Sequence, residues 1–338
     1  MKKIIQYIIL ITIGVIGISS CKKNFSQETF IQTVNPTIPD FATQINAGVN
    51  GFITDENNNA VQGATVHAGA ITITTNQFGY FNIPNTAFAK SAGFIQIIKA
   101  GYFTGYKTFL PVEGKETFIR LQLIPKTTTG NFDAATGGVV TTADGATISL
   151  PANAVVVAAN NTNYIGTVNV FAHWFNPSQQ DKTQLTMPGN LLGIDSAGHL
   201  NALVTYGMVA VELQSPSGQL LQIAPNKKAT IQFPIPASVQ ANAPNTILLW
   251  YFNETNGVWQ QEGWAIKNAN NYFAAVSHFS YWNCDYPSPL VNLKAQMLNT
   301  QLQPLANMPV EISRVNNPAD IRIAYTNAEG VINMVVIS

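Results

Sequence analysis

Charged residues are scarce in this chain. Asp, Glu, Lys and Arg make up 10% of its 338 residues, and the 17 basic side chains balance the 17 acidic ones. A protein that binds nucleic acid offsets the phosphate charges with a surplus of Lys and Arg. The composition therefore argues against nucleic acid as a partner and leaves Asn, Thr and Gln to form much of the surface.

Residues that bind metals are few as well. The chain has 4 histidines and 2 cysteines, Cys21 and Cys284. The histidines are well separated, and their spacing does not form a metal cluster. We therefore expect neither a metal nor another cofactor. Hydrophobic cores must supply the stability, because at most one disulfide could form.

Long apolar runs are missing, with one exception at the start of the chain. Two lysines precede an almost wholly apolar stretch, residues 4–18, that ends in small residues before Cys21. The stretch is shorter than the roughly 20 residues of a membrane-spanning helix. It resembles a bacterial lipoprotein signal of the Bacteroidetes type, in which the cysteine becomes the lipid-bearing N-terminus. The resemblance implies a signal peptide over residues 1–20 and lipidation at Cys21.

A lipidated Cys21 would decide where the protein works. Its acyl chains would hold everything after it at a membrane, and the resemblance implies the outer membrane of a cell envelope, facing either the periplasm or the exterior. Without the two lysines of the signal, 15 basic residues face 17 acidic ones, a formal charge of −2. Cys284 would then have no disulfide partner. Residues 21–47 are polar and interrupted by prolines, so we expect a tether there.

Strand patterns fill the rest of the sequence. Apolar and polar residues alternate in segments such as 65–68 (TVHA), 166–170 (GTVNV) and 208–213 (MVAVEL). A period of two is typical of half-buried strands. Turn-forming residues separate these segments, and no amphipathic helix exceeds about two turns. We predict an all-β chain of tandem antiparallel β-sandwiches.

The first predicted domain covers residues 48–125. Its motifs are, in order, 51–55 (GFITD), 60–66 (AVQGATV), 74–81 (TTNQFGYF) and 97–102 (IIKAGY). This order resembles the carboxypeptidase regulatory-like domain, which implies a seven-stranded transthyretin-like sandwich. Gly63 and Gly79 suit turns with positive φ, while Val66 and Phe81 suit the core. The resemblance predicts a fold and no catalytic site.

Regulatory-like domains accompany zinc carboxypeptidases, so that activity needs a separate check. Those enzymes bind zinc through a His-x-x-Glu pair and a distant third histidine. None of the four histidines here is followed three residues later by Glu. We therefore reject carboxypeptidase activity and expect that the protein is not an enzyme.

The second predicted domain covers residues 131–285. Its opening, residues 137–154 (GGVVTTADGATISLPANA), resembles the start of the ZU-type β domain of ankyrins, netrin receptors and cartilage intermediate layer proteins. The segments 250–259 and 277–283 (SHFSYWN) share this resemblance. Because ZU-type domains act mostly through protein contacts, the resemblance implies a scaffold between two sandwiches and a protein ligand.

Residues 289–338 repeat the motif order of the first domain. The matching segments are 293–297 (LKAQM), 304–310 (PLANMPV) and 325–332 (YTNAEGVI). The first copy continues well past the equivalent hairpin, whereas the chain stops at Ser338. We expect either a partial second sandwich with open strand edges that need covering, or a fragment of a longer protein.

One triplet suggests chemistry. Some ZU-type domains cut themselves at a His-Phe-Ser triplet, and this resemblance would make Ser280 the nucleophile and His278 the base, severing the Phe279 to Ser280 bond. The alternative is an ordinary alternating strand, with Phe279 inward and the other two side chains on the opposite face. Self-cleavage is therefore one alternative function.

A cluster of tryptophans suggests a second alternative. If Trp250, Trp259 and Trp264 were exposed on a sheet, they could stack against sugar rings in a carbohydrate-binding accessory protein. Otherwise they belong to the core and to cross-strand pairs. The leading hypothesis remains a lipid-anchored protein with a non-catalytic binding, adhesion or structural role, and with protein or glycan as its ligand.

Overall fold

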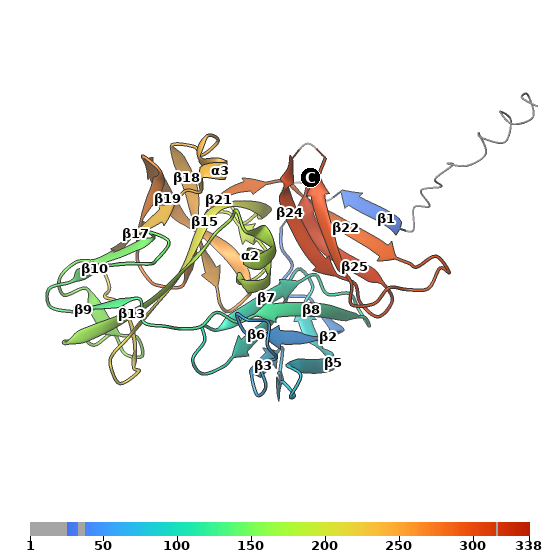
Figure 1. The fold of residues 1–338 in the computed structure, drawn as a ribbon, viewed down its shortest axis with the longest axis horizontal. Coiled ribbons are helices and arrows are strands. Elements are labelled where there is room, and N and C mark those ends of the chain that lie inside the picture. Colours follow the sequence, from blue (N-terminus) through green and yellow to red (C-terminus); the bar gives the residue numbers. More distant parts are fainter. Residues whose placement is uncertain (1–25, 33–37, 316) are drawn as a thin grey trace, which may run out of the picture.

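The structure is a computed structural model that describes residues 26–32, 38–315 and 317–338. It is 56% strand and 4% helix, and the strands form several antiparallel sheets (Figure 1). The prediction of an all-β chain is confirmed. The predicted signal peptide over residues 1–20 and the predicted lipidation site Cys21 lie outside the described residues. Within the described part, no helix is long and apolar enough to cross a membrane.

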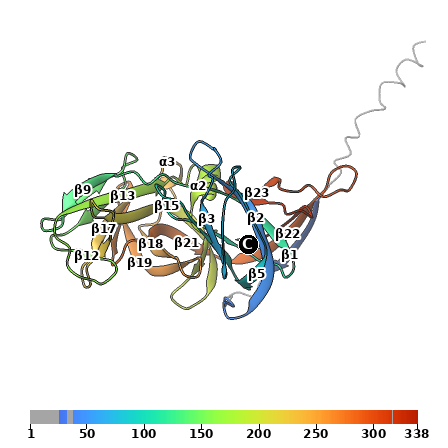
Figure 2. The same cartoon turned by 90° about the horizontal axis from the view of Figure 1, so that it is seen from below.

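The first module contains seven strands between residues 44 and 122, arranged in two sheets (Figure 2). The strands are β2 (Gln44–Thr54), β3 (Thr65–Ala68), β4 (Ile71–Thr74), β5 (Tyr80–Ala89), β6 (Gly93–Ile98), β7 (Gly105–Phe109) and β8 (Glu116–Gln122). One sheet has the order β5-β2-β8 and the other β4-β3-β6-β7. Within this module β2 and β8 pair in parallel. The chain crosses from one sheet to the other between β7 and β8, which lets β8 run in the direction of β2.

The core of the first module lies between its two sheets. Val66 and Phe81 are buried there, as the sequence pattern predicts. Gly63 and Gly79 have φ angles of 66° and 69°, which glycine adopts without strain. A Cβ on Gly79 would also clash with the carbonyl oxygen of Ile53. This glycine is therefore required both by its backbone angle and by its packing.

The central module holds thirteen strands between residues 130 and 288. They are β9 (Gly130–Asp133), β10 (Gly138–Thr141), β11 (Thr147–Leu150), β12 (Val155–Val157), β13 (Thr167–Phe175), β14 (Leu192–Ile194), β15 (Leu200–Gln214), β16 (Leu220–Ile223), β17 (Ala229–Pro234), β18 (Thr246–Asn253), β19 (Val258–Asn268), β20 (Asn271–Val276) and β21 (Tyr281–Ser288). The main sheet order is β10-β11-β17-β20-β19-β18-β21-β15-β13-β9. A bridge between Asp133 and Gly137 joins its two ends, so the sheet curls round its own core. Two short helices, α2 (Gln180–Thr186) and α3 (Ala237–Gln240), lie between strands.

A shared core joins the first and central modules. Phe103 and Tyr106 pack in one buried cluster with Trp250, Phe252 and Trp259. Polar bonds surround this cluster: Tyr106 Oη donates to Glu254 (2.7 Å), Tyr281 Oη donates to the Thr104 carbonyl (2.7 Å), and Lys126 Nζ pairs with Glu212 (2.9 Å). Because apolar side chains from both modules are buried together, the two modules form one packed body.

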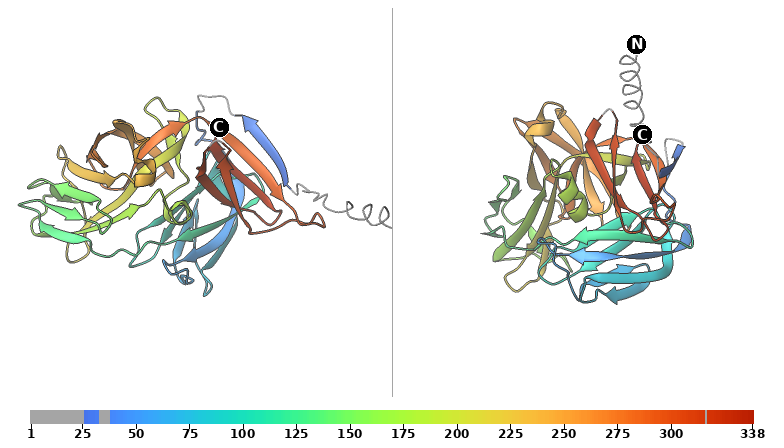
Figure 3. Two further views of the ribbon diagram at one scale, coloured as in Figure 1. Left: turned by 45° about the horizontal axis from the view of Figure 1, so that its top comes forward. Right: turned by 45° about the vertical axis from the view of Figure 1, so that its right-hand side comes forward.

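The C-terminal module shows how an open strand edge is covered. It comprises β22 (Leu290–Met297), β23 (Pro309–Arg314), β24 (Asn317–Tyr325) and β25 (Val331–Ile337). β25 lies on one side of β22, and the other side pairs with β1 (Ser26–Gln32), as Figure 3 shows beside the red strands. The tether expected over residues 21–47 is thus interrupted by a strand, and β2 already begins within it. β1 is drawn into the sheet because β22 would otherwise leave backbone donors and acceptors unpaired.

The first and C-terminal modules repeat the same hydrogen bonds. β22 pairs with β25 as β2 pairs with β5, and β23 pairs with β24 as β3 pairs with β4. A buried threonine hydroxyl follows in each: Thr75 Oγ1 donates to Val61 O (2.6 Å) and accepts from Ala64 N (2.9 Å), while Thr326 Oγ1 donates to Leu305 O (2.6 Å) and accepts from Met308 N (2.9 Å). The next residues, Asn76 and Asn327, both form side-chain turns before Gly79 and Gly330, whose φ angles are 69° and 72°. The internal repeat read from the sequence therefore extends to individual atoms.

Candidate functional site

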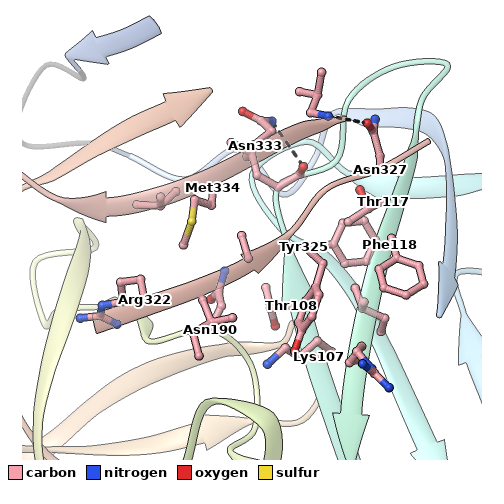
Figure 4. A pocket seen from close by; sticks show the side chains of 18 of the residues that line it. Lys107, Thr108, Thr117, Phe118, Asn190, Arg322, Tyr325, Asn327, Asn333 and Met334 are labelled. Atoms are coloured by element: carbon pink, nitrogen blue, oxygen red, sulfur yellow. Dashed lines mark hydrogen bonds between the residues drawn. The ribbon is translucent and has the colours of Figure 1, made fainter. Parts of the chain in front are cut away.

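A cavity lies where all three modules meet, between β7 and β8 of the first module, α2 of the central module, and β24 and β25 (Figure 4). Its volume is about 180 Å³. An apolar cavity of about 150 Å³ in another protein is large enough to bind benzene. We call this space the junction cavity. It has room for a small organic molecule.

Helix α2 forms one wall of the junction cavity. Two of its glutamines also bond to the edge of β24. Gln180 Oε1 accepts a hydrogen bond from the amide of Ile321 at 2.6 Å, and Gln184 Oε1 accepts one from the amide of Ile323 at 2.7 Å. The side-chain amide of Gln184 also donates to the Ile321 carbonyl. The two glutamines can act together because residues four apart share one face of a helix.

Aromatic and aliphatic side chains form most of the remaining wall. Phe118 on β8 and Tyr325 on β24 pack edge to face with ring centroids 5.9 Å apart. Met334 on β25 and Met187 just after α2 also line the space. Figure 4 shows Tyr325 and Phe118 on one side and Met334 on the other. These groups can bury the apolar part of a ligand.

The charged lining is mainly cationic. Five cationic side chains line the cavity: Lys107, Lys115, Arg120, Lys294 and Arg322. The lining contains two carboxylates, Glu116 and Glu329. Both have partners, because Asn50 donates to Glu116 at 2.6 Å and Lys115 pairs with Glu329 at 2.5 Å. The cavity therefore has a surplus of positive charge in a chain that is neutral overall.

Lys107 is the most unusual of these cations. Its ammonium group donates to the carbonyl of Gln184 at 2.7 Å, and among the described residues it forms no ion pair with a carboxylate. Burial disfavours the charged amine and lowers the pKa of Lys107 to about 8. At neutral pH the cavity still presents a largely protonated, poorly hydrated ammonium.

Arg322 connects the cavity to a buried polar cluster in the central module. Its Nη2 donates to the carbonyl of Leu203 at 2.7 Å. Its charge also favours ionisation of the fully buried Asp285, whose carboxylate accepts a 2.6 Å bond from Asn283. The effect of burial is larger than that of the Arg322 charge, so the pKa of Asp285 is raised. Arg322 thereby ties the middle of β24 to the central sheet.

The His278-Phe279-Ser280 triplet lies in the bend between β20 and β21. The expected alternating strand is therefore wrong, although Phe279 is buried as that interpretation required. The imidazole of His278 packs on the rings of Tyr251 and Trp282, with centroids 4.8 and 4.9 Å away. The Ser280 hydroxyl donates instead toward Phe252 O at 3.1 Å and Glu254 at 3.4 Å.

The backbone of Phe279 is held by a side chain that the sequence did not single out. Gln222 accepts from the Phe279 amide at 2.7 Å and donates to the Phe279 carbonyl at 3.1 Å. Of the hydrogen bonds recorded for the described residues, none joins His278 to Ser280. The geometry thus gives His278 a packing role and does not place it as a base for Ser280.

The three tryptophans separate into two groups. Trp250 and Trp259 are 0% exposed, and Trp259 lies across the hairpin from Phe252. The prediction that Trp250 and Trp259 stack against sugar rings is wrong, because both side chains are buried in the shared core of the first two modules. Trp264 is 60% exposed and remains available to a ligand.

Trp264 lies on the solvent-exposed side of the central sheet. The side chain two residues further along β19, Ile266, is 62% exposed. Ile266 belongs to a row of side chains that are neighbours in register across five strands: Thr147, Gln232, Phe273, Ile266 and Thr246. We call this row with Trp264 the outer face. It combines an exposed indole with hydroxyl and amide groups.

The junction cavity could not be found from the sequence. Its walls come from segments near residues 107, 184 and 322, which are far apart in the chain and carry no shared motif. Cys284, by contrast, is a free, buried thiol whose pKa is raised by burial. Within the described ranges, no group of three His, Cys, Asp or Glu side chains is placed to hold a metal ion.

The sequence is similar to part of one characterised protein. It is 33% identical over 108 residues to human cartilage intermediate layer protein 2. This match covers 31% of the chain and 9% of that protein, so the chain spans only a small part of its relative. This partial similarity agrees with the resemblance to cartilage intermediate layer proteins noted in the sequence. No family model matches the chain.

Comparison with solved structures finds distant β-rich neighbours. A putative carbohydrate binding protein from Bacteroides uniformis is 9% identical with a TM-score of 0.19, covering 89% of this chain and 100% of that one. The TIE protein of Bacillus anthracis is 12% identical with a TM-score of 0.20, covering 75% and 46%. The major pilin subunit of Bacillus cereus gives a TM-score of 0.13 at 10% identity and covers 86% and 85%. These neighbours are β-rich, and at these TM-scores they carry no argument about the function of the chain.

Proposed function

We propose that this chain is a non-catalytic binding protein of a bacterial cell envelope, anchored by lipid at Cys21, and that it takes its ligand in the junction cavity. The observation that carries the proposal is the cavity itself, which three packed modules enclose with an apolar wall and a few polar groups. Such a combination is typical of small-molecule sites. The sequence resemblance to lipoprotein signals supports the anchor.

A matched pair of substitutions tests the cavity. Ala324 lines it from β24, and an indole at this position would fill the space. We expect Ala324→Trp to weaken binding of the neutral fluorescent probe N-phenyl-1-naphthylamine at least tenfold. Ala197→Trp, in the exposed turn between β14 and β15, serves as the control. Equal binding by both variants would refute the cavity as the site.

The anchor is tested on protein extracted from its own membranes. We expect an intact mass that exceeds residues 21–338 by the mass of several acyl chains. An unmodified chain that still carries residues 1–20 would refute the lipid anchor while leaving the cavity proposal untouched.

Glycan binding on the outer face is a second candidate function. The observation in its favour is the exposure of Trp264 beside uncharged Thr and Gln side chains, since indoles stack on sugar rings and amides bond to hydroxyls. Trp264→Ala should abolish retention on immobilised cell-wall glycan. Phe78→Ala, which removes a comparably exposed ring in the first module, should not change it. Equal retention of both variants and the unaltered chain would refute this function.

A further inference from the structure

The unbalanced charge in the junction cavity indicates what kind of ligand fits it. Both lining carboxylates already have partners, and Lys107 has a carbonyl oxygen as its partner in place of an acid. The ammonium of Lys107 is partly shielded from water, and a nearby anion favours its charged form. Among the described residues, the positive charge of Lys107 is therefore not paired with a carboxylate.

The rest of the lining limits the kind of anion. Phe118, Tyr325 and Met334 present apolar surface to the same space. An inorganic anion would leave this surface in contact with water, whereas a neutral hydrocarbon would leave the ammonium uncompensated. A ligand with one acidic end and one apolar body satisfies both parts of the wall.

We propose that the junction cavity binds a small amphipathic anion, with its acid group at the Lys107 ammonium and its apolar body between Tyr325 and Met334. This inference rests on the proposed function of the cavity. In Figure 4, Lys107 lies at one end of the space, below Tyr325, and Met334 lies further along it. A simple carboxylic acid with a short apolar chain has the required chemistry.

Arg322 adds to the positive field of the site without being its anchor. Its guanidinium already bonds to Leu203 and interacts with the buried Asp285. Lys294 and Arg120 are exposed near the mouth of the cavity, where water screens their charge. Lys107 is therefore the residue whose charge the ligand should sense most strongly.

Two fluorescent probes that share the same ring system distinguish the effect of the ligand's charge from simple occupation of the cavity. 8-Anilinonaphthalene-1-sulfonate carries an acid group, and N-phenyl-1-naphthylamine lacks it. For the full chain we expect the sulfonate to bind at least tenfold more tightly. Lys107→Met should remove that advantage, lowering sulfonate affinity about tenfold with no loss for the neutral probe, since one charge-assisted contact disappears. Lys227→Met, on the exposed turn between β16 and β17, is the control.

The pattern of outcomes distinguishes the two levels of the proposal. Binding of both probes with no preference, or equal weakening of both by Lys107→Met, would overturn the anionic ligand while the cavity function stands. Failure of both probes to bind would overturn the cavity function itself. As a further check, octanoate should displace the sulfonate probe and octanol should not; displacement by both would also overturn the inference.

Discussion

Thr75 and Thr326 occupy equivalent positions in two modules, and at the scale of single residues they carry matching energetic roles. Each hydroxyl is buried and connects one backbone amide to one backbone carbonyl. A valine has nearly the same shape but can make neither bond. In each module one backbone amide and one backbone carbonyl would then lose a partner, which is costly where folding has removed them from water, as it has for the Thr75 bonds.

We predict that Thr75→Val and Thr326→Val each lower the free energy of unfolding by about 2 kcal/mol. Urea denaturation followed by tryptophan fluorescence would measure this. Thr230→Val on the exposed side of β17 should change the stability by less than about 0.5 kcal/mol. A large loss of stability in Thr75→Val with none in Thr326→Val would contradict the prediction, because the same hydrogen-bond geometry would then not stabilise the two modules equally.

Several of these residues could be predicted and others could not. Gly79 and Phe81 follow from local pattern, because a tight turn and an inward strand position are local properties. Trp250 and Trp264 look alike in sequence, yet one is buried and the other exposed. What separates them is packing against the first module, which no local pattern contains.

At the scale of elements, the short helix α2 acts mainly through its glutamines. Gln184 bonds to the amide and carbonyl groups of β24, so a helix side chain does for this strand edge what a neighbouring strand would otherwise do. The sequence offered no sign of this, since a helix of two turns in an all-β chain has no visible partner. β1 could not be predicted for the same reason, because its pairing depends on a strand edge over 250 residues away in the sequence.

Replacing Gln184 tests whether α2 holds β24 in place. We predict that in Gln184→Leu the amide of Ile323 exchanges with solvent at least tenfold faster because it loses its hydrogen-bond acceptor, whereas the amide of Ile321 keeps Gln180 Oε1 as its acceptor. Hydrogen exchange with mass spectrometry would measure the rates. Gln240→Leu on α3 removes one bond to a different segment and should leave β24 unchanged. Unchanged exchange in Gln184→Leu would mean that packing alone holds the strand.

At the scale of the whole molecule, the scarcity of charge leaves few groups that can make stability depend on pH. Two buried groups with opposite effects stand out. Burial lowers the pKa of His173 to about 4, so between pH 6.5 and 4 the unfolded chain takes up a proton that the folded chain refuses. Burial raises the pKa of Asp285, so the folded chain holds a proton that the unfolded chain releases above its usual pKa of 3.8.

The direction of each pH effect on stability follows from the difference in proton binding between the folded and the unfolded chain. Stability from His173 is present above its unfolded pKa and is lost as pH falls toward 4, by at most about 3 kcal/mol. Asp285 acts the other way, since its burial penalty grows as pH rises. We predict that His173→Gln flattens the gain in stability between pH 4.5 and 7.5, and that Asp285→Asn steepens it. Urea denaturation at both pH values would measure the two slopes. Equal slopes in both variants and the unaltered chain would show that neither buried group titrates with folding, and the pH dependence would then belong to the exposed carboxylates.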